Sequence, residues 1–167
     1  IAGPITGDPP VGVRVVPVET TDEMATAVRA ALATADVLLM AAAPADFRPA
    51  VVASQKIKKG SAAPALVLAN TADILQTTRD ARRPGCVVVG FALETEHLDA
   101  RAREKLASKD LDLIVANGTG DGAGFGYDTN RVTLLDRDGA REELPLLSKT
   151  DVADAILDRV AGLLHGR

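Results

Sequence analysis

The chain has 167 residues, 47% of them hydrophobic, and its 19 basic and 23 acidic residues give a formal net charge of −4. This length fits one domain with a substantial core. The acidic balance argues against a nucleic-acid scaffold but allows a local basic pocket for a phosphate. The single cysteine, Cys86, excludes an intramolecular disulfide framework, and the two histidines lie too far apart to indicate a structural zinc site.

The first 42 residues contain a predicted strand, a predicted helix and a second predicted strand, in that order. Residues 13–18 are largely β-branched and apolar, which predicts a strand. Thr20 and Glu23 match the S/T-x-x-E capping box, so we expect a helix that continues through Leu32. Residues 37–42 form a continuous apolar run, which is typical of a parallel strand covered on both faces.

The middle of the chain continues this alternation. Strands are predicted at residues 65–69, 86–92 and 111–116, with helices from Asn70 or Thr71 to about Ala81 and over residues 99–109. The β-α-β order predicts an α/β fold, with a doubly wound, Rossmann-like, mostly parallel sheet and right-handed crossovers.

The last third has a different pattern. Residues 131–135 and 142–144 flank Asp138-Gly139, which is a hairpin signal. Ser148 is placed to cap a final helix whose apolar positions recur every four residues. We therefore predict a single domain over residues 1–167 that ends in a β-hairpin and a helix.

Candidate binding residues follow the predicted strands, where open α/β sheets bind their ligands. In the segment "AAAPADFRP", residues 41–49, small side chains would let a flat group approach the backbone, and Asp46 could accept from a sugar hydroxyl or hold a cation. Phe91 could lie against a base. A polar surface loop after an alanine-rich strand end explains the same residues equally well.

Two lysine pairs are candidates for phosphate binding. Lys56 and Lys58 of "KIKKG" lie on one side of the chain if it is extended, and point charges on flexible stems suit a mobile phosphate clamp. Lys105 and Lys109 are spaced i, i+4 on a predicted helix and so share one face. The alternative for both pairs is a solvated surface.

Several nucleotide and hydrolase motifs are absent. "GTGDGAGFG", residues 118–126, contains no G-x-G-x-x-G register, and it precedes a predicted strand instead of opening a helix. The Walker A, G-x-S-x-G and H-E-x-x-H motifs do not occur. An NAD(P)-dependent oxidoreductase is accordingly the least favoured hypothesis.

Seven stretches together resemble bacterial phosphopantothenoylcysteine synthetase, usually the carboxyl-terminal half of a bifunctional coenzyme A biosynthesis flavoprotein. In chain order they are "AAAPADFRPA", "KIKK", "TADIL", "VVVGFALET", "REKLASKDLDLIVAN", "GAGFGYDTN" and "LPLLSKTDVADAIL". The resemblance implies a ligase in which the carboxylate of 4′-phosphopantothenate attacks the α-phosphate of CTP, and the cysteine amine then displaces CMP. Magnesium would accompany the CTP.

The same resemblance implies roles for individual residues. Lys56 and Lys105 would be the catalytic cations, and no metal ligand is expected from the chain. The nucleotide would be bound by Ala41, Ala42, Asp46, Lys56, Ala72, Asp73, Ile74, Leu75, Phe91, Lys105 and Lys109.

The resemblance also implies partners and a larger protein. Such synthetases dimerise with active sites near the interface, so we expect a homodimer, with the tail hairpin and residues 118–130 as candidate interface elements. The family's amino-terminal segment with its S-N-x-S-S-G-type motif is not in this sequence, nor is the flavin-dependent decarboxylase half. We expect a chain truncated at its amino-terminal side, without flavin, and active only with the upstream segment. The alternative is a catalytically incomplete nucleotide-binding module or partner subunit.

No signal peptide and no apolar span of 18 residues are present in the sequence. We therefore expect a cytoplasmic protein that binds neither nucleic acid nor membrane.

Overall fold

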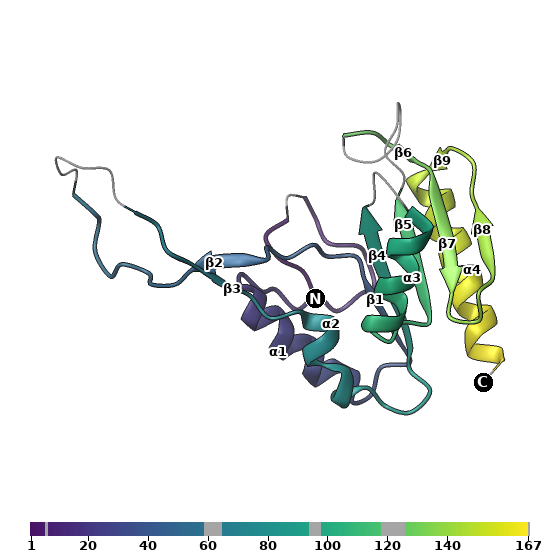
Figure 1. Cartoon of the computed structure of the whole chain (residues 1–167), viewed down its shortest axis with the longest axis horizontal. Coiled ribbons are helices and arrows are strands. Elements are labelled where there is room, and N and C mark those ends of the chain that lie inside the picture. The colour runs from purple at the N-terminus through teal and green to yellow at the C-terminus, as the bar shows by residue number, and fades with distance from the viewer. Residues whose placement is uncertain (6, 59–64, 94–97, 118–125, 167) are drawn as a thin grey trace.

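The central feature of the computed structural model is a five-stranded sheet in the order β1-β4-β5-β7-β8 (Figure 1). The structure describes residues 1–5, 7–58, 65–93, 98–117 and 126–166. The strands are β1 (Val37–Met40), β4 (Val87–Leu93), β5 (Leu113–Asn117), β7 (Val132–Asp136) and β8 (Arg141–Glu143). Strands β1, β4 and β5 are parallel, and β7 and β8 add an antiparallel hairpin at one edge.

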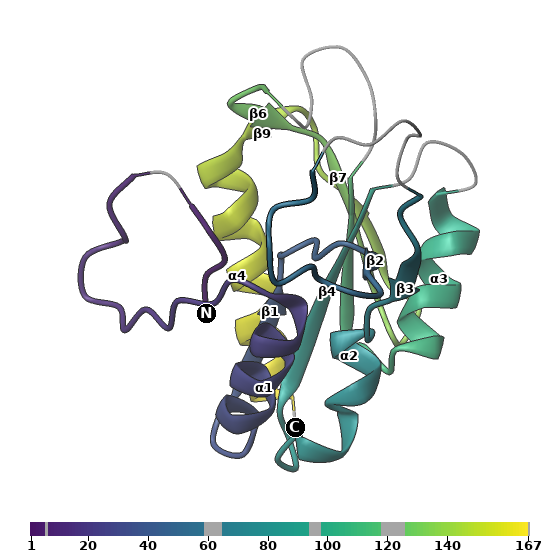
Figure 2. The same cartoon turned by 90° about the vertical axis from the view of Figure 1, so that its left-hand side faces the viewer.

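Helices cover both faces of this sheet (Figures 1 and 2). On one face lie α1 (Thr21–Leu32), the short α2 (Ile74–Thr77) with the 3-10 turn η1 (Arg79–Ala81), and α3 (Leu98–Ser108); α4 (Lys149–His165) covers the other. Alternate strand residues therefore enter separate cores. Val88 and Ile114 join the α1–α2–α3 core, whereas Val87, Val89 and Leu113 join the α4 core. The doubly wound α/β prediction is confirmed, because both faces of β4 are buried.

Local capping signals account for two of the helices as predicted. Thr20 caps α1, its side chain accepts from the Glu23 N–H, and the Glu23 carboxylate accepts from the Thr20 N–H in return. Ser148 caps α4 by accepting from the Asp151 N–H at 3.1 Å. Each cap satisfies backbone donors that the first helical turn leaves without partners.

The helix predicted from Asn70 or Thr71 to Ala81 is wrong in its start and its length. Its cap is Asp73, and α2 ends after Thr77. The hydroxyls of Thr77 and Thr78 donate to the carbonyls of Asp73 and Ile74, at 2.8 and 2.6 Å. Such back-bonding by β-branched residues competes with helix propagation, so the chain tightens into a 3-10 turn.

Two predicted strands also differ from the structure. Residues 13–18 form no strand, and only an isolated bridge joins Pro17 to Ala2. Proline removes a ladder donor, and Val13 stays 57% exposed. The 65–69 prediction corresponds to β3 (Leu68–Asn70), which pairs with β2 (Phe47–Pro49) in a separate ribbon. An apolar run does not distinguish a core strand from an exposed one.

The remaining strands form a short ribbon, in which β6 (Thr129–Asn130) pairs antiparallel with β9 (Leu147–Ser148). In the part of the chain that the structure describes, no helix has the length and apolar character needed to cross a bilayer.

Candidate functional site

The parallel strands bring three predicted segments to one edge of the sheet. Met40 pairs in register with Gly90, and Ala92 pairs with Ala116. The chain therefore leaves β1, β4 and β5 at the same edge, which we call the carboxyl edge. Open α/β sheets bind ligands at this edge.

Backbone hydrogen bonds tie the segment after β1 to the segment before α2. Thr71 donates from its N–H to the Asp46 carbonyl at 2.9 Å, and its hydroxyl donates to the Ala45 carbonyl at 2.5 Å. Asp46 thus lies beside the "TADIL" residues, as the predicted site requires. Within the described residues, the exposed Asp46 carboxylate makes no hydrogen bond or ion pair, so it is available to a ligand.

The residues of "TADIL" have different roles in the structure. Ala72 is exposed, and Asp73 caps α2 by accepting from the Gln76 N–H at 3.2 Å. Ile74 and Leu75 are 3% and 7% exposed and pack in the α1–α2–α3 core. Any contact of these two residues with a nucleotide is therefore limited to their main chain.

Lys105 lies in α3, and Lys109 directly follows this helix, with its N–H donating to the Lys105 carbonyl at 3.0 Å. Lys109 binds Asp73 through a 2.9 Å ion pair, which connects the end of α3 to the start of α2. Lys105, one helical turn earlier, is partly buried and lines a surface hollow together with Leu93, at the carboxyl end of β4. The lysines therefore join the Asp46–Asp73 group on the α1–α2–α3 side of the sheet.

Phe91 lies on the other side of the sheet. Its position in β4 alternates with Val88 and Ala92, and its partly buried side chain packs against the α4 core. The structure does not bring Phe91 together with Lys105 and Lys109. A base that contacts Phe91 must therefore extend over the carboxyl edge of the sheet.

Lys56 is separated from the rest of the predicted site. It is exposed in the segment between β2 and β3, and Figure 1 shows this segment extending away from the sheet. We call the segment, together with β2 and β3, the arm (residues 47–70). Residues 59–64 of the arm, including the end of "KIKKG", lie outside the described part of the chain.

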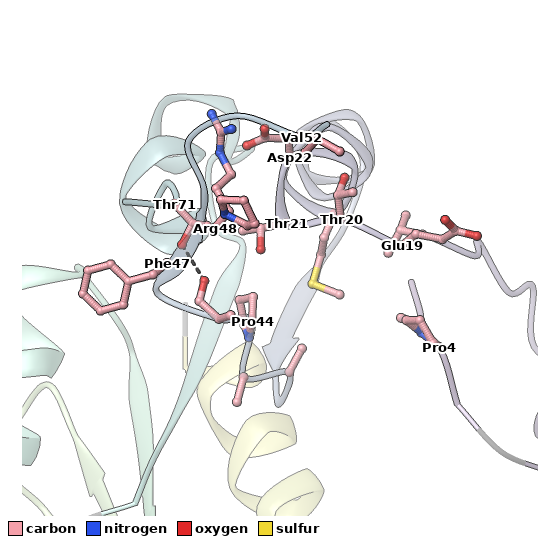
Figure 3. Close-up of a pocket in the computed structure, with 17 residues that line it drawn as sticks. Pro4, Glu19, Thr20, Thr21, Asp22, Pro44, Phe47, Arg48, Val52 and Thr71 are labelled. Atoms are coloured by element: carbon pink, nitrogen blue, oxygen red, sulfur yellow. Dashed lines mark hydrogen bonds between the residues drawn. The ribbon is translucent and has the colours of Figure 1, made fainter. Parts of the chain in front are cut away.

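A cleft of about 710 Å³ lies beside the 41–49 segment, and Asp46 is not among the residues that line it (Figure 3). Arg48, Ala42 and Thr71 line it, together with Thr20 and Thr21 at the start of α1. Ala41 is exposed but does not line this cleft. Sequence patterns identified Thr20 only as a helix cap, because nothing in the local sequence indicates that α1 begins beside the 41–49 segment.

The capping box of α1 places the Glu23 carboxylate at the start of this helix. The backbone N–H groups of Glu19 and Thr20 donate to the Glu23 carboxylate, at 2.7 and 2.9 Å, and hold the pKa of Glu23 below its ordinary value. The helix N-terminus is thus already supplied with a negative charge. Among the described residues that line this cleft, Arg48 is the cation, and Glu19 and Asp22 are acidic.

The segment between β5 and β7 begins and ends at the same edge. Asn130 donates to the Asn117 side-chain oxygen at 3.2 Å. Most of the glycine-rich stretch, residues 118–125, lies outside the described residues. Within the described ranges, no group of three or more His, Cys, Asp or Glu residues is arranged to hold a metal ion.

Comparison with known proteins decides the family. A family model described as "DNA/pantothenate metabolism flavoprotein C-terminal domain" matches residues 1–164. The chain belongs to this family. It is 42% identical over 165 residues to the coenzyme A biosynthesis bifunctional protein CoaBC of Bacillus subtilis, covering 98% of this chain and 40% of that protein. The resemblance stated from the sequence motifs is thereby confirmed.

Further relatives show the same domain in longer proteins. A cysteine/cysteine sulfinic acid decarboxylase from an unknown prokaryotic organism is 36% identical over 167 residues, with 99% of this chain and 46% of that protein covered. The crystal structure of a CoaBC C-terminal domain matches with a TM-score of 0.81 and 34% identity, covering 99% of this chain and 73% of that one. The chain spans less than half the length of these two curated relatives.

Proposed function

We propose that this domain joins 4′-phosphopantothenate to cysteine at the expense of CTP, as the synthetase part of coenzyme A biosynthesis. The observation that carries the proposal is the 42% identity to a CoaBC protein across 98% of the chain. The contact between Asp46 and Thr71 supports it, because it assembles two motif segments at the ligand-binding edge of an α/β sheet.

The reaction consists of two displacements. A carboxylate oxygen of 4′-phosphopantothenate attacks the α-phosphorus of CTP, and the bond to the pyrophosphate leaving group breaks. The amine of cysteine then attacks the acyl carbon, CMP leaves, and the amine loses a proton as the amide forms. Activation supplies the leaving group, so the protein mainly positions reactants and stabilises developing negative charge.

Lys105 is the stronger of the two α3 candidates for phosphate binding. Lys109 lies at the far end of the helix from the carboxyl edge and is paired with Asp73. Lys105 lies one turn closer to the end of β4, where the phosphates of a nucleotide at the carboxyl edge would lie. Asp46 would accept from a hydroxyl or amine of the nucleotide, and Ala41 and Ala72 leave room for close approach. Magnesium enters with CTP as part of the substrate.

The cleft beside the 41–49 segment is proposed to hold the phosphopantothenate. Its lining is mostly apolar, with Thr20 and Thr21 hydroxyls for the pantothenate chain and Arg48 for its phosphate (Figure 3). The nucleotide at Asp46 and the acyl substrate in the cleft would then both lie against the 41–49 segment, which would bring the reacting carboxylate close to the α-phosphate.

We also propose that the domain is a homodimer held by its arms. Val51, Val52, Ile57, Leu66 and Val67 of the arm are each at least 68% exposed. An isolated two-stranded ribbon is marginally stable in water, and large exposed apolar patches mark association sites. A second copy of the arm supplies both a matching apolar surface and strand edges. The predicted role of Lys56 is then fulfilled in the partner's site.

The relatives named above support placing this domain in a longer cytoplasmic protein that also carries a flavin-dependent decarboxylase part. In that arrangement the flavin belongs to the decarboxylase, and this domain receives its substrates from solution.

Release of pyrophosphate with CTP, 4′-phosphopantothenate and cysteine tests the function. The assay compares this chain with a version extended upstream, and ATP replaces CTP as the control. We expect CTP-dependent release that needs phosphopantothenate, and Arg48→Gln should raise the KM for phosphopantothenate alone. CTP binding without turnover in both versions would favour the nucleotide-binding module instead.

Sedimentation and complementation test the dimer. Val51→Asp with Val67→Asp should convert a dimer to a monomer, whereas Val13→Asp, an exposed valine outside the arm, should not. Mixing Lys56→Ala with Lys105→Ala chains should restore activity, since one site of the mixed dimer then has both lysines. No restoration would place Lys56 in the site of its own chain.

A further inference from the structure

The opposite edge of the sheet contains a small basic pocket that the proposed ligase reaction does not use. It is lined by Arg79, Arg82, Arg83, Cys86, Val88, Asp110, Asp112 and Arg137. These residues lie where β4 and β5 begin and where α3 and β7 end. The pocket therefore lies at the edge where β4 and β5 begin, and Arg82 joins it to the main chain of Leu75 and Lys109.

The arginine side chains of this pocket outnumber the carboxylates that pair with them. Arg137 pairs with Asp110 and Asp112, at 2.9 and 3.2 Å, and Arg82 lies 3.7 Å from Asp110. Arg83 is neutralised from outside the pocket by an ion pair with Asp36 at 2.8 Å. Four guanidinium groups thus share three carboxylates.

Arg79 is the guanidinium without a carboxylate. Within the described residues it makes no ion pair, and it donates to the Ser108 carbonyl at 2.8 Å. Its remaining donors and its charge are available to an anion in the pocket.

Arg82 is the most buried cation that lines the pocket. Its side chain is 9% exposed, and its terminal nitrogens donate to the carbonyls of Leu75 and Asp110, both at 2.7 Å. Its Nε is buried and has no hydrogen-bond partner. Burial also lowers the pKa of Arg82. Arg82 is therefore a buried cation whose charge no carboxylate contacts closely, and an anion in the pocket would stabilise it.

The pocket volume limits the size of the ligand. At about 270 Å³ it lies just below the range of roughly 300–1,000 Å³ that drug-sized ligands occupy. Guanidinium groups match the geometry of phosphate oxygens. We infer that this edge binds a small oxyanion, either inorganic phosphate or the phosphate of a small monoester, in the pocket beside Arg79 and Arg82.

Nuclear magnetic resonance of the arginine Nε–H groups tests this site directly. Inorganic phosphate is titrated into the 15N-labelled protein at constant ionic strength, with chloride as the matched salt. We expect the Arg82 Nε–H signal to shift and saturate with phosphate but not with chloride. A parallel titration with glycerol phosphate distinguishes a monoester from free phosphate, since the tighter of the two identifies the preferred form.

Two variants test whether phosphate binds in this pocket or elsewhere on the protein. Arg79→Gln should raise the phosphate concentration at which the Arg82 Nε–H shift is half-complete by about tenfold, as expected for the loss of one charged hydrogen bond. Arg14→Gln, an exposed arginine outside the pocket, should leave it unchanged. The inference is overturned if phosphate shifts only signals at the carboxyl edge, such as the Phe91 amide, or if Arg82 responds equally to chloride.

Discussion

The two edges of the central sheet use charged residues in different ways. At the carboxyl edge, Asp46 is exposed and has no partner among the described residues, and small side chains surround it. At the opposite edge, Asp112 is 4% exposed and accepts from the Val88 N–H at 2.8 Å, in addition to its ion pair with Arg137. One edge keeps its charges available to ligands, while the other uses most of them to join chain segments.

The largest difference between the edges should be in stability. Asp112→Ala removes the acceptor of the Val88 N–H and one of the two carboxylates paired with Arg137, which should cost about 3 kcal/mol of the free energy of unfolding. Asp46→Ala at the carboxyl edge should change it by less than about 0.5 kcal/mol. Urea denaturation of the two variants measures this, and equal losses would contradict the comparison.

The next largest difference should be in nucleotide affinity. Lys105→Ala should weaken CTP binding about tenfold, the cost of one charged contact, without changing the fold. Lys109→Ala should weaken it less, because Lys109 lies one helical turn farther from the end of β4. Calorimetric titration with CTP measures both, and an unchanged affinity for Lys105→Ala would exclude its assigned role.

The smallest expected effect concerns the α1 cap beside the cleft. The pKa of Glu23 is lowered by backbone N–H donors, so the folded state favours the ionised carboxylate. Its stabilising contribution is therefore present above the ordinary pKa of 4.5 and lost as the pH falls through the lower folded value. Glu23→Ala should lower the Tm slightly at pH 7, and the difference from the unchanged protein should disappear in acid. A difference that grows in acid would refute the assignment.

Most of the fold was predictable because its signals are local. The Thr20–Glu23 box depends on residues three apart, and the apolar runs of β4 and β5 reflect burial on both faces. The two misplaced strands had similar apolar runs. Their outcome depended on whether a partner strand and a covering helix were available, which no short window of sequence contains.

Part of the candidate site was also predictable, because the order of the motifs can be read from the sequence. Motif order indicated Asp46, Asp73 and Lys109, and the structure joins their segments through Thr71 and an ion pair. The burial of Ile74 and Leu75 was missed, because a motif names positions but does not say which atoms face the ligand. The position of Arg48 in a cleft beside Thr20 and Thr21 is not predictable from the local sequence, because it depends on where α1 begins in space.

The sequence by itself determined the helix caps, the buried strands, the α/β class and the family resemblance, because each depends on neighbouring residues or on motif order. Only the tertiary structure placed Phe91 on the opposite face from Lys105, extended the arm away from the sheet, and left Arg82 with an unused buried donor. These features depend on how segments distant in the chain pack together. Packing of that kind follows from the shape and burial of the whole domain.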